Sequence, residues 1–176
     1  RGQRTKTNTR TRKGPHGEEP SNFLSDKLRE YGFPELVVDD IKTNRTIAKL
    51  LVKNTGINFE ESESGEKALE MIKVKHYDVI LLDQRMPGLT GVETLQKMKE
   101  MDHLNKDVPV VALTADVEAG AAEYYIAAGF TEYMPKPMDP VSYETMLIRL
   151  IPHDKIKIIN DDDDNVAKES ETESEK

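Results

Sequence analysis

Residues 79–91 read Val-Ile-Leu-Leu-Asp-Gln-Arg-Met-Pro-Gly-Leu-Thr-Gly, and this stretch decides the fold. Its first four residues form a continuous apolar run, which is typical of a central strand that is buried on both faces of a sheet. The run ends at Asp83, and Pro87 and Gly88 then favour a tight turn. The sequence therefore predicts a sheet protein in which this strand lies near the centre.

Strand-like and helix-like segments alternate on both sides of this run. The other strand-like segments are 36–38, 57–59, 108–113 and 133–134. The helix-like segments are 47–51, 68–72, 92–98, 117–128 and 141–150. Five strands and five helices in strict alternation predict an α/β fold with a doubly wound, five-stranded parallel sheet in a single domain.

Two of the helices are predicted in more detail. Ile47, Leu50 and Leu51 mark an apolar face that is expected to pack on the sheet, and this helix is expected to stop at Gly56. The Ala-rich helix over 117–128 is expected to be closed by the following glycine.

The two ends of the chain differ from its middle in charge. The first 13 residues hold six basic residues and no acid, whereas residues 161–176 hold eight acids against two lysines. These charges cancel, so the net charge of −8 at pH 7 belongs to the middle part. Segments with so little to bury are expected to be disordered. The predicted organisation is a basic tail and short linker at 1–33 (with a short helix over 23–33), a folded domain at 34–152 and an acidic, flexible tail at 153–176.

Composition argues against several classes of protein. An acidic folded part is unsuited to nucleic acid, because phosphate contacts need clustered Lys and Arg. The chain contains no cysteine, which rules out disulfides and thiolate metal sites. No apolar run approaches the ~20 residues that a membrane helix needs, and the basic N-terminus lacks the apolar core of a secretion signal. We expect no membrane contact within this chain and a cytoplasmic location.

Polar side chains that can do chemistry follow four of the five strands. They are Asp39 and Asp40 after the first strand, Asp83 after the third, Thr114 after the fourth and Lys136 after the fifth. Because ligands sit at the carboxyl ends of parallel strands, these side chains are expected to converge.

Two carboxylates ~4 Å apart repel by roughly 4 kcal/mol at an effective dielectric constant of 20, and a divalent cation would relieve that repulsion. Oxygen ligands without His or Cys favour Mg²⁺ over zinc. A lysine and a hydroxyl beside a metal-bound carboxylate suit a phosphoryl group, which a carboxylate can accept covalently.

Each of these residues also has a purely structural interpretation. Taken alone, Asp39 and Asp40 would more often form a strand-to-loop turn than a metal site. Thr114 is also an ordinary β-branched strand residue, and Tyr133 is also an ordinary core residue. Lys136 on a surface loop would normally be solvated. Only the combination of these residues favours a phosphoryl site.

Four motifs resemble those of the receiver domain of two-component response regulators. They are Leu-Val-Val-Asp-Asp (36–40), Asp-Gln-Arg-Met-Pro-Gly-Leu-Thr-Gly (83–91), Ala-Leu-Thr-Ala (112–115) and Tyr-Met-Pro-Lys-Pro (133–137). The resemblance covers roughly residues 34–152 and is closest to receivers attached to hybrid sensor histidine kinases. It implies a flavodoxin-like fold and a role in a phosphorelay, in which Asp83 accepts a phosphoryl group from the phosphohistidine of a histidine kinase or a histidine phosphotransfer domain.

The resemblance also implies a Mg²⁺ site. Asp40 and Asp83 would bind the ion directly, and Asp39 would act largely through water. The backbone carbonyl of Arg85 would complete the protein ligands.

The remaining implied roles concern the phosphoryl group and the response to it. Lys136 would pair with the phosphoryl oxygens, and its peptide bond to Pro137 would be cis. Thr114 would hydrogen-bond to the phosphoryl group and draw Tyr133 inward, which would reshape the face made by the fourth helix, fifth strand and fifth helix. A downstream protein would bind that face, and a homodimer of the chain is left open as an alternative.

Some residues depart from the usual family pattern or vary within it. Ile41 follows the acid pair where a polar residue is common, while Arg85 and Asp116 stand at two positions that tune the lifetime of the phosphate. Arg85 also bears on an alternative function, an aspartyl-nucleophile phosphatase or phosphotransferase. Phosphatases of the haloacid dehalogenase type need an acid at this position, two residues after the nucleophile. We therefore expect a regulatory phosphoacceptor and no enzyme with turnover, either standing alone or ending a longer hybrid kinase. A degenerate receiver is disfavoured because every acid, the hydroxyl and the lysine are present.

Overall fold

A five-stranded parallel sheet forms the centre of the computed structural model, which describes residues 33–53 and 55–155. Its strands are β1 (Pro34–Val38), β2 (Asn58–Ser62), β3 (Val79–Asp83), β4 (Val110–Thr114) and β5 (Glu132–Pro135). The strand order is β2-β1-β3-β4-β5, and every neighbouring pair is parallel. The chain therefore reverses its winding direction beside β1 and β3, and ligands bind at such a switch point. The predicted fold class is confirmed.

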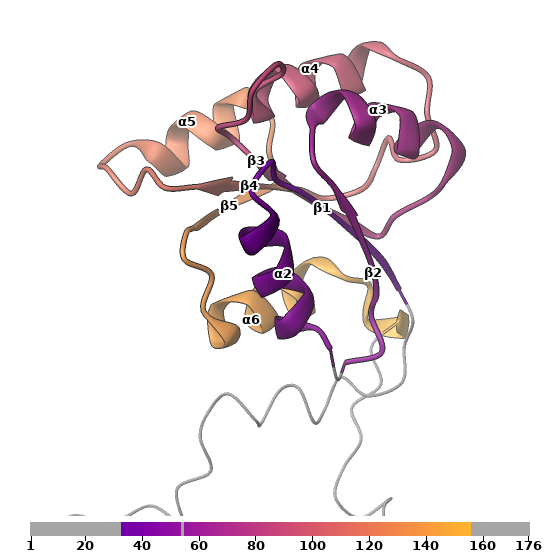
Figure 1. Ribbon diagram of the computed structural model, residues 1–176, viewed down its shortest axis with the longest axis vertical. Coiled ribbons are helices and arrows are strands. Elements are labelled where there is room, and N and C mark those ends of the chain that lie inside the picture. The colour runs from indigo at the N-terminus through magenta and orange to yellow at the C-terminus, as the bar shows by residue number, and fades with distance from the viewer. Residues whose placement is uncertain (1–32, 54, 156–176) are drawn as a thin grey trace, which may run out of the picture.

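Helices cover both faces of the sheet (Figure 1). Three lie on one face, namely α3 (Gly65–Val74), α4 (Gly91–Glu100) and α5 (Ala121–Ala128). The other face carries α2 (Lys42–Leu51) and α6 (Pro140–Leu150). Within the described part of the chain, no helix combines the length and the apolar character needed to cross a bilayer.

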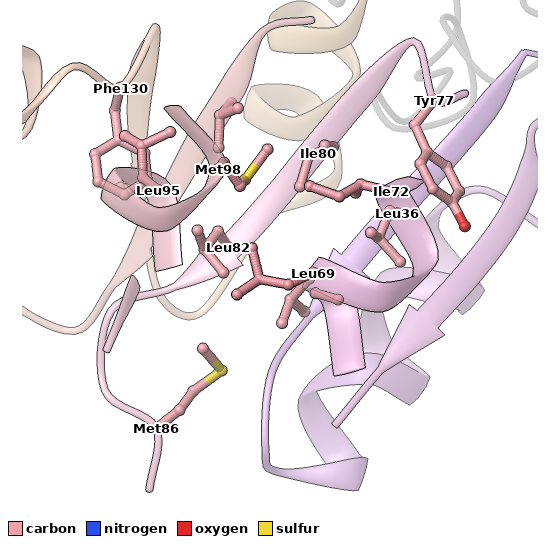
Figure 2. Close-up of a cluster of buried hydrophobic side chains, with 14 of the residues drawn as sticks. Leu36, Leu69, Ile72, Tyr77, Ile80, Leu82, Met86, Leu95, Met98 and Phe130 are labelled. Carbon is pink, nitrogen blue, oxygen red and sulfur yellow. The ribbon is translucent and has the colours of Figure 1, made fainter. Parts of the chain in front are cut away.

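Each face of the sheet has its own hydrophobic core, and β3 contributes to both. Ile80 and Leu82 point into the core under α3, α4 and α5, which Figure 2 shows. Val79 and Leu81 point into the core under α2 and α6. All five residues of β3 are buried, as predicted for the apolar run, because alternate side chains of a strand face opposite sides of its sheet.

Helix α2 buries a different face from the predicted one. Ile47 is 38% exposed and Leu50 is 61% exposed, so that part of the prediction was wrong. The residues that α2 buries are Arg45 and Ala48, while Leu51 is partly buried against the core. The guanidinium of Arg45 donates to the backbone carbonyls of Asp39 and Asp40. A hydrophobic pattern assumes that charged side chains face water, and here one does not.

Helix α5 is shorter than predicted and begins at Ala121. Gly120 precedes it with φ of +96°, and residues 117–119 are not helical. A positive φ is readily adopted by glycine only, so the chain changes direction at this point. The helix ends before Gly129, which also has a positive φ, as predicted.

The domain boundaries are only partly covered by the structure. The short helix expected over 23–33 lies outside the described residues, apart from Phe33, which is buried in the core under α2 and α6. Both tails beyond 33–155 also lie outside the described residues. At the C-terminal side, the short 3₁₀ helix η1 (His153–Lys155) continues past the predicted end at residue 152, and Lys155 pairs with Asp78 at the amino end of β3.

Candidate functional site

Three carboxylates meet at the carboxyl ends of β1 and β3. One oxygen each of Asp39, Asp40 and Asp83 lies within 4.8 Å of the other two. Asp39 and Asp83 are buried, and Asp40 is partly buried. The buried Oδ1 atom of Asp40 has no hydrogen-bond partner among the described residues. An unpartnered buried carboxylate oxygen in an acidic cluster is well suited to bind a hard cation.

Lys136 brings a positive charge to this cluster from the end of β5. Its Nζ atom lies 2.7 Å from Asp39 Oδ2 and 2.9 Å from Asp83 Oδ1. Burial by itself lowers the pKa of Lys136, but the hydrogen bonds to the two carboxylates outweigh burial and raise the pKa above its ordinary value. The lysine therefore stays charged. Its peptide bond to Pro137 is cis, which confirms the expectation from the resemblance.

The carboxyl group of Asp83 has a perturbed pKa. Burial raises the pKa of its carboxyl group, and although Lys136 opposes that effect, the nearby charge of Asp39 adds to it. The backbone N–H of Arg85 donates to Asp83 Oδ1 at 3.2 Å. A carboxylate in a desolvated site beside a fixed ammonium group can act as a nucleophile.

Two residues of α2 hold Asp39 in place, and sequence reasoning missed both. The side-chain amide of Asn44 donates to both Asp39 oxygens, at 3.2 Å and 3.1 Å, and the N–H of Ile41 donates to Asp39 Oδ1 at 2.8 Å. Arg45 donates to the carbonyl of Asp39 at 2.7 Å and to that of Asp40 at 3.2 Å. The oxygens of Asp39 are thus engaged already. The sequence feature that could have indicated them is the polar pair at 44–45, which follows the two acids by about one helical turn.

A close backbone approach fixes the position of Asp83. Gly91 is the first residue of α4, and a Cβ atom there would lie 2.6 Å from the carbonyl oxygen of Asp83. The N–H of Gly91 donates to the carbonyl of Gln84 at 3.1 Å. A capping box of Thr90 and Glu93 starts the helix. A glycine is therefore required at position 91, because any larger residue would collide with the backbone of Asp83.

Thr114 and Tyr133 lie on the α5 side of the sheet, where neither side chain is fully exposed to solvent. The Oγ1 atom of Thr114 accepts from the N–H of Asp116 at 3.0 Å and from the hydroxyl of Tyr125 at 2.8 Å. Tyr133 is partly buried, and its ring stacks on that of Tyr125 with centroids 6.2 Å apart. Sequence reasoning singled out Thr114 and Tyr133 but missed Tyr125.

The sequence model of the "Response regulator receiver domain" family matches residues 36–148. This chain belongs to the receiver domain family. Receiver domains are regulatory phosphoacceptors of two-component signalling, and they interact with histidine kinases or phosphotransfer domains. The match covers every strand end described above, so the acidic cluster and the lysine lie inside the family's region.

Several curated proteins contain a similar receiver domain. Hybrid signal transduction histidine kinase M of Dictyostelium discoideum is 34% identical over 120 residues, which cover 66% of this chain and 5% of that protein. The histidine-protein kinase BarA of Escherichia coli K12 is 30% identical over 117 residues, which cover 66% of this chain and 13% of that protein. The chain thus spans a small part of the curated relatives that it matches.

Solved structures of receiver domains share the fold. The chemotaxis protein CheY4 of Vibrio cholerae is 26% identical with a TM-score of 0.62, covering 68% of this chain and 99% of that one. The receiver domain of a sensor histidine kinase from Pseudomonas aeruginosa is 28% identical with a TM-score of 0.61, covering 68% of this chain and 97% of that one. The latter has a magnesium ion coordinated in its active-site cleft. Receiver domains bind Mg²⁺ in this cleft, and the acidic cluster of this chain fits such an ion.

An ion pair joins the loops that follow β3 and β4. Nη2 of Arg85 lies 3.0 Å and 2.9 Å from the two carboxylate oxygens of Asp116, which joins the loop after β3 to the loop after β4. Both side chains are largely exposed, so the pair contributes little to stability. Beside it lies a cavity of about 710 Å³, lined in part by Pro87, Thr90 and Gly120. Arg85 and Asp116 themselves line this cavity, whereas Asp39, Asp40 and Asp83 do not.

Proposed function

We propose that Asp83 accepts a phosphoryl group from the phosphohistidine of a histidine kinase or a histidine phosphotransfer domain. The observation that carries this proposal is the position of Lys136, whose ammonium lies within 3 Å of both Asp39 and Asp83. A fixed cation beside a buried carboxylate can bind the oxygens of a transferring phosphoryl group as their charge develops.

In the proposed reaction, one carboxylate oxygen of Asp83 attacks the phosphorus atom. The new P–O bond forms as the P–N bond to the donor imidazole breaks, and the electron pair of that bond leaves with the imidazole nitrogen. Lys136 would move its hydrogen bond from the Asp83 oxygen to a phosphoryl oxygen. Thr114 would donate a hydrogen bond from its hydroxyl to another phosphoryl oxygen.

We assign the Mg²⁺ ligands as Asp40 and Asp83 directly, Asp39 through water and the backbone carbonyl of Arg85. The free Oδ1 of Asp40 supports a direct bond, whereas the Asp39 oxygens already accept several N–H groups, which supports an indirect one. When bound, Mg²⁺ supplies positive charge that offsets the charge on the transferring oxygens.

The proposed output is a change in the surface made by α5, β5 and α6, with Thr114 and Tyr133 as the switch. Ile126 on α5 and Val141 on α6 are exposed apolar side chains on these helices, which supports a protein partner, or a second copy of the chain, at this face. We also propose that residues 34–152 form the receiver unit and that it catalyses only its own phosphorylation and dephosphorylation. Arg85 stands where a phosphatase of the haloacid dehalogenase type needs an acid, so that alternative is not favoured.

Incubation with acetyl phosphate and Mg²⁺ tests the proposed function. The expected result is the addition of one phosphoryl group per chain, which is measured by intact mass spectrometry. Chelation of the metal should remove most of the gain, because three carboxylates then repel the incoming phosphate. No mass increase with Mg²⁺ present, or an equal increase in excess chelator, contradicts the proposal.

Mg²⁺ should also stabilise the folded chain, because the acidic cluster exists only in the folded state. At a concentration of 100 times the dissociation constant, a single site adds about 2.7 kcal/mol to the free energy of unfolding. Asp40→Asn should lose most of this gain, since an amide replaces a charged ligand. Thermal unfolding of both proteins with and without Mg²⁺ measures the difference. Asp102→Asn is the matched control, because Asp102 is an exposed acid just after the C-cap of α4. An unchanged response in Asp40→Asn, or an equal loss in the control, would refute the ligand assignment.

A further inference from the structure

The hydroxyl of Tyr125 makes a buried hydrogen bond that the reaction scheme does not use. Tyr125 lies on α5 and donates to Oγ1 of Thr114 at 2.8 Å. Tyr125 is only 2% exposed and Thr114 only 1% exposed. A hydrogen bond between two hydroxyls without access to water is costly to break unless each finds another partner.

The hydrogen-bonding capacity of Thr114 explains why this bond matters. A threonine hydroxyl has two acceptor lone pairs and one donor proton. Both lone pairs are engaged, by the N–H of Asp116 at 3.0 Å and by the Tyr125 hydroxyl at 2.8 Å. These two donors hold Oγ1 on the α5 side of the sheet. When Thr114 turns to a phosphoryl group on Asp83, the Tyr125 hydroxyl loses the acceptor that the structure shows for it.

The ring of Tyr125 is held from two further sides. It stacks on Tyr133 with an interplanar angle of 16°, and it packs edge-to-face with Phe130 with centroids 5.7 Å apart. The phenol therefore cannot follow Thr114 without disturbing Tyr133. One residue thus contacts both members of the proposed switch, Thr114 through its hydroxyl and Tyr133 through its ring face.

We propose that Tyr125 is a positioning residue that stabilises the resting conformation of Thr114 and so opposes the phosphorylated conformation. This inference rests on the proposed function of Asp83 as phosphoacceptor. Since the bound conformation is reached only after the buried hydrogen bond is broken, the fraction of binding-competent molecules is reduced by that cost, and the apparent affinity for a phosphoryl group falls in proportion.

The test is Tyr125→Phe, which keeps the ring and removes only the hydroxyl. The probe is beryllium trifluoride with Mg²⁺, a phosphoryl mimic that binds a carboxylate oxygen. We expect Tyr125→Phe to bind it about tenfold more tightly than the wild type, which corresponds to ~1.4 kcal/mol. Tyr124→Phe is the matched control and should leave the dissociation constant unchanged, because Tyr124 is the exposed neighbour on the same helix.

Two further measurements separate positioning from a general loss of packing. In a Thr114→Ala background, Tyr125→Phe should no longer change the affinity, because the hydrogen bond is already absent. In the free Tyr125→Phe protein, without Mg²⁺, the Thr114 methyl NMR resonance should shift from its wild-type position toward the position seen in the beryllium trifluoride complex. A merely structural role would produce neither result.

The outcomes distinguish the inference from the function that it builds on. If the wild type fails to bind the probe, the phosphoacceptor assignment itself fails. If the wild type binds but Tyr125→Phe has the same affinity, the inference is overturned. Weaker binding by Tyr125→Phe also overturns it, because Tyr125 would then support Thr114 in the bound state.

Discussion

Asp83→Asn is expected to abolish phosphorylation of the chain by acetyl phosphate and Mg²⁺. The amide oxygen of Asn is uncharged and a far weaker nucleophile than a carboxylate, so no acyl phosphate can form. The substitution also removes one of the three charges of the acidic cluster and one of the two acceptors of Lys136. Asp39 does not replace it, because its oxygens already accept hydrogen bonds from Ile41, Asn44 and Lys136. Intact mass spectrometry should show the full gain of one phosphoryl group in the wild type and none in the variant.

Two controls establish which side chain carries the phosphoryl group. Asp102→Asn changes an exposed aspartate of the same size and should be phosphorylated like the wild type. The label should be lost on treatment with hydroxylamine, which cleaves acyl phosphates but not phosphate esters of hydroxyl groups. Persistent labelling of Asp83→Asn, or a label that survives hydroxylamine, would place the phosphoryl group on a different side chain and overturn the assignment.

The positions of the reactive residues could be predicted because they depend on only two features of the sequence. Apolar runs give the strands, and a parallel sheet places the carboxyl ends of those strands at one edge. The residue that follows each run is therefore placed by topology and not by side-chain packing. Asp39, Asp83 and Lys136 meet in the structure for this reason.

The features that the sequence did not reveal depend on hydrogen bonds between distant side chains. The buried side chain of Arg45 donates to two backbone carbonyls, and Ile47 and Leu50 of the same helix are exposed, against the hydrophobic pattern. Tyr125 resembles any aromatic core residue until its hydroxyl is seen on Thr114. Periodicity reports which side a residue faces on average, but it does not report a specific polar partner.

Glu35 is another such residue, and a large dependence of stability on pH is expected from it. It lies in β1, is fully buried, and accepts a hydrogen bond from the hydroxyl of Tyr143 on α6. Its Oε2 atom has no partner among the residues that the structure describes. Burial raises the pKa of Glu35 from 4.5 to about 7, against the smaller opposing effect of Tyr143. The folded chain therefore holds this carboxyl group in its neutral form through the mildly acidic range.

The direction of the effect follows from the two protonation states. Between pH 4.5 and about 7, the folded state keeps the proton of Glu35 while the unfolded chain has released it. Stability must then fall as pH rises through this range and level off above it. At 1.36 kcal/mol per pKa unit, the loss in the free energy of unfolding is on the order of 3 kcal/mol. Urea unfolding at several pH values from 5 to 8 measures it.

Glu35→Gln isolates this contribution from that of the other titrating groups. Glutamine is neutral at every pH, still offers Tyr143 an acceptor and has nearly the same volume, so the variant should be flatter across the range than the wild type. The difference between the two proteins in the free energy of unfolding should therefore move by about 2 to 3 kcal/mol in favour of the variant between pH 5 and pH 8, because part of the change already falls below pH 5. Glu70→Gln, an exposed position on α3, should keep the wild-type slope. A difference between wild type and Glu35→Gln that stays constant with pH would show that Glu35 is ionised in the folded chain throughout, and that the buried core under α6 tolerates the charge.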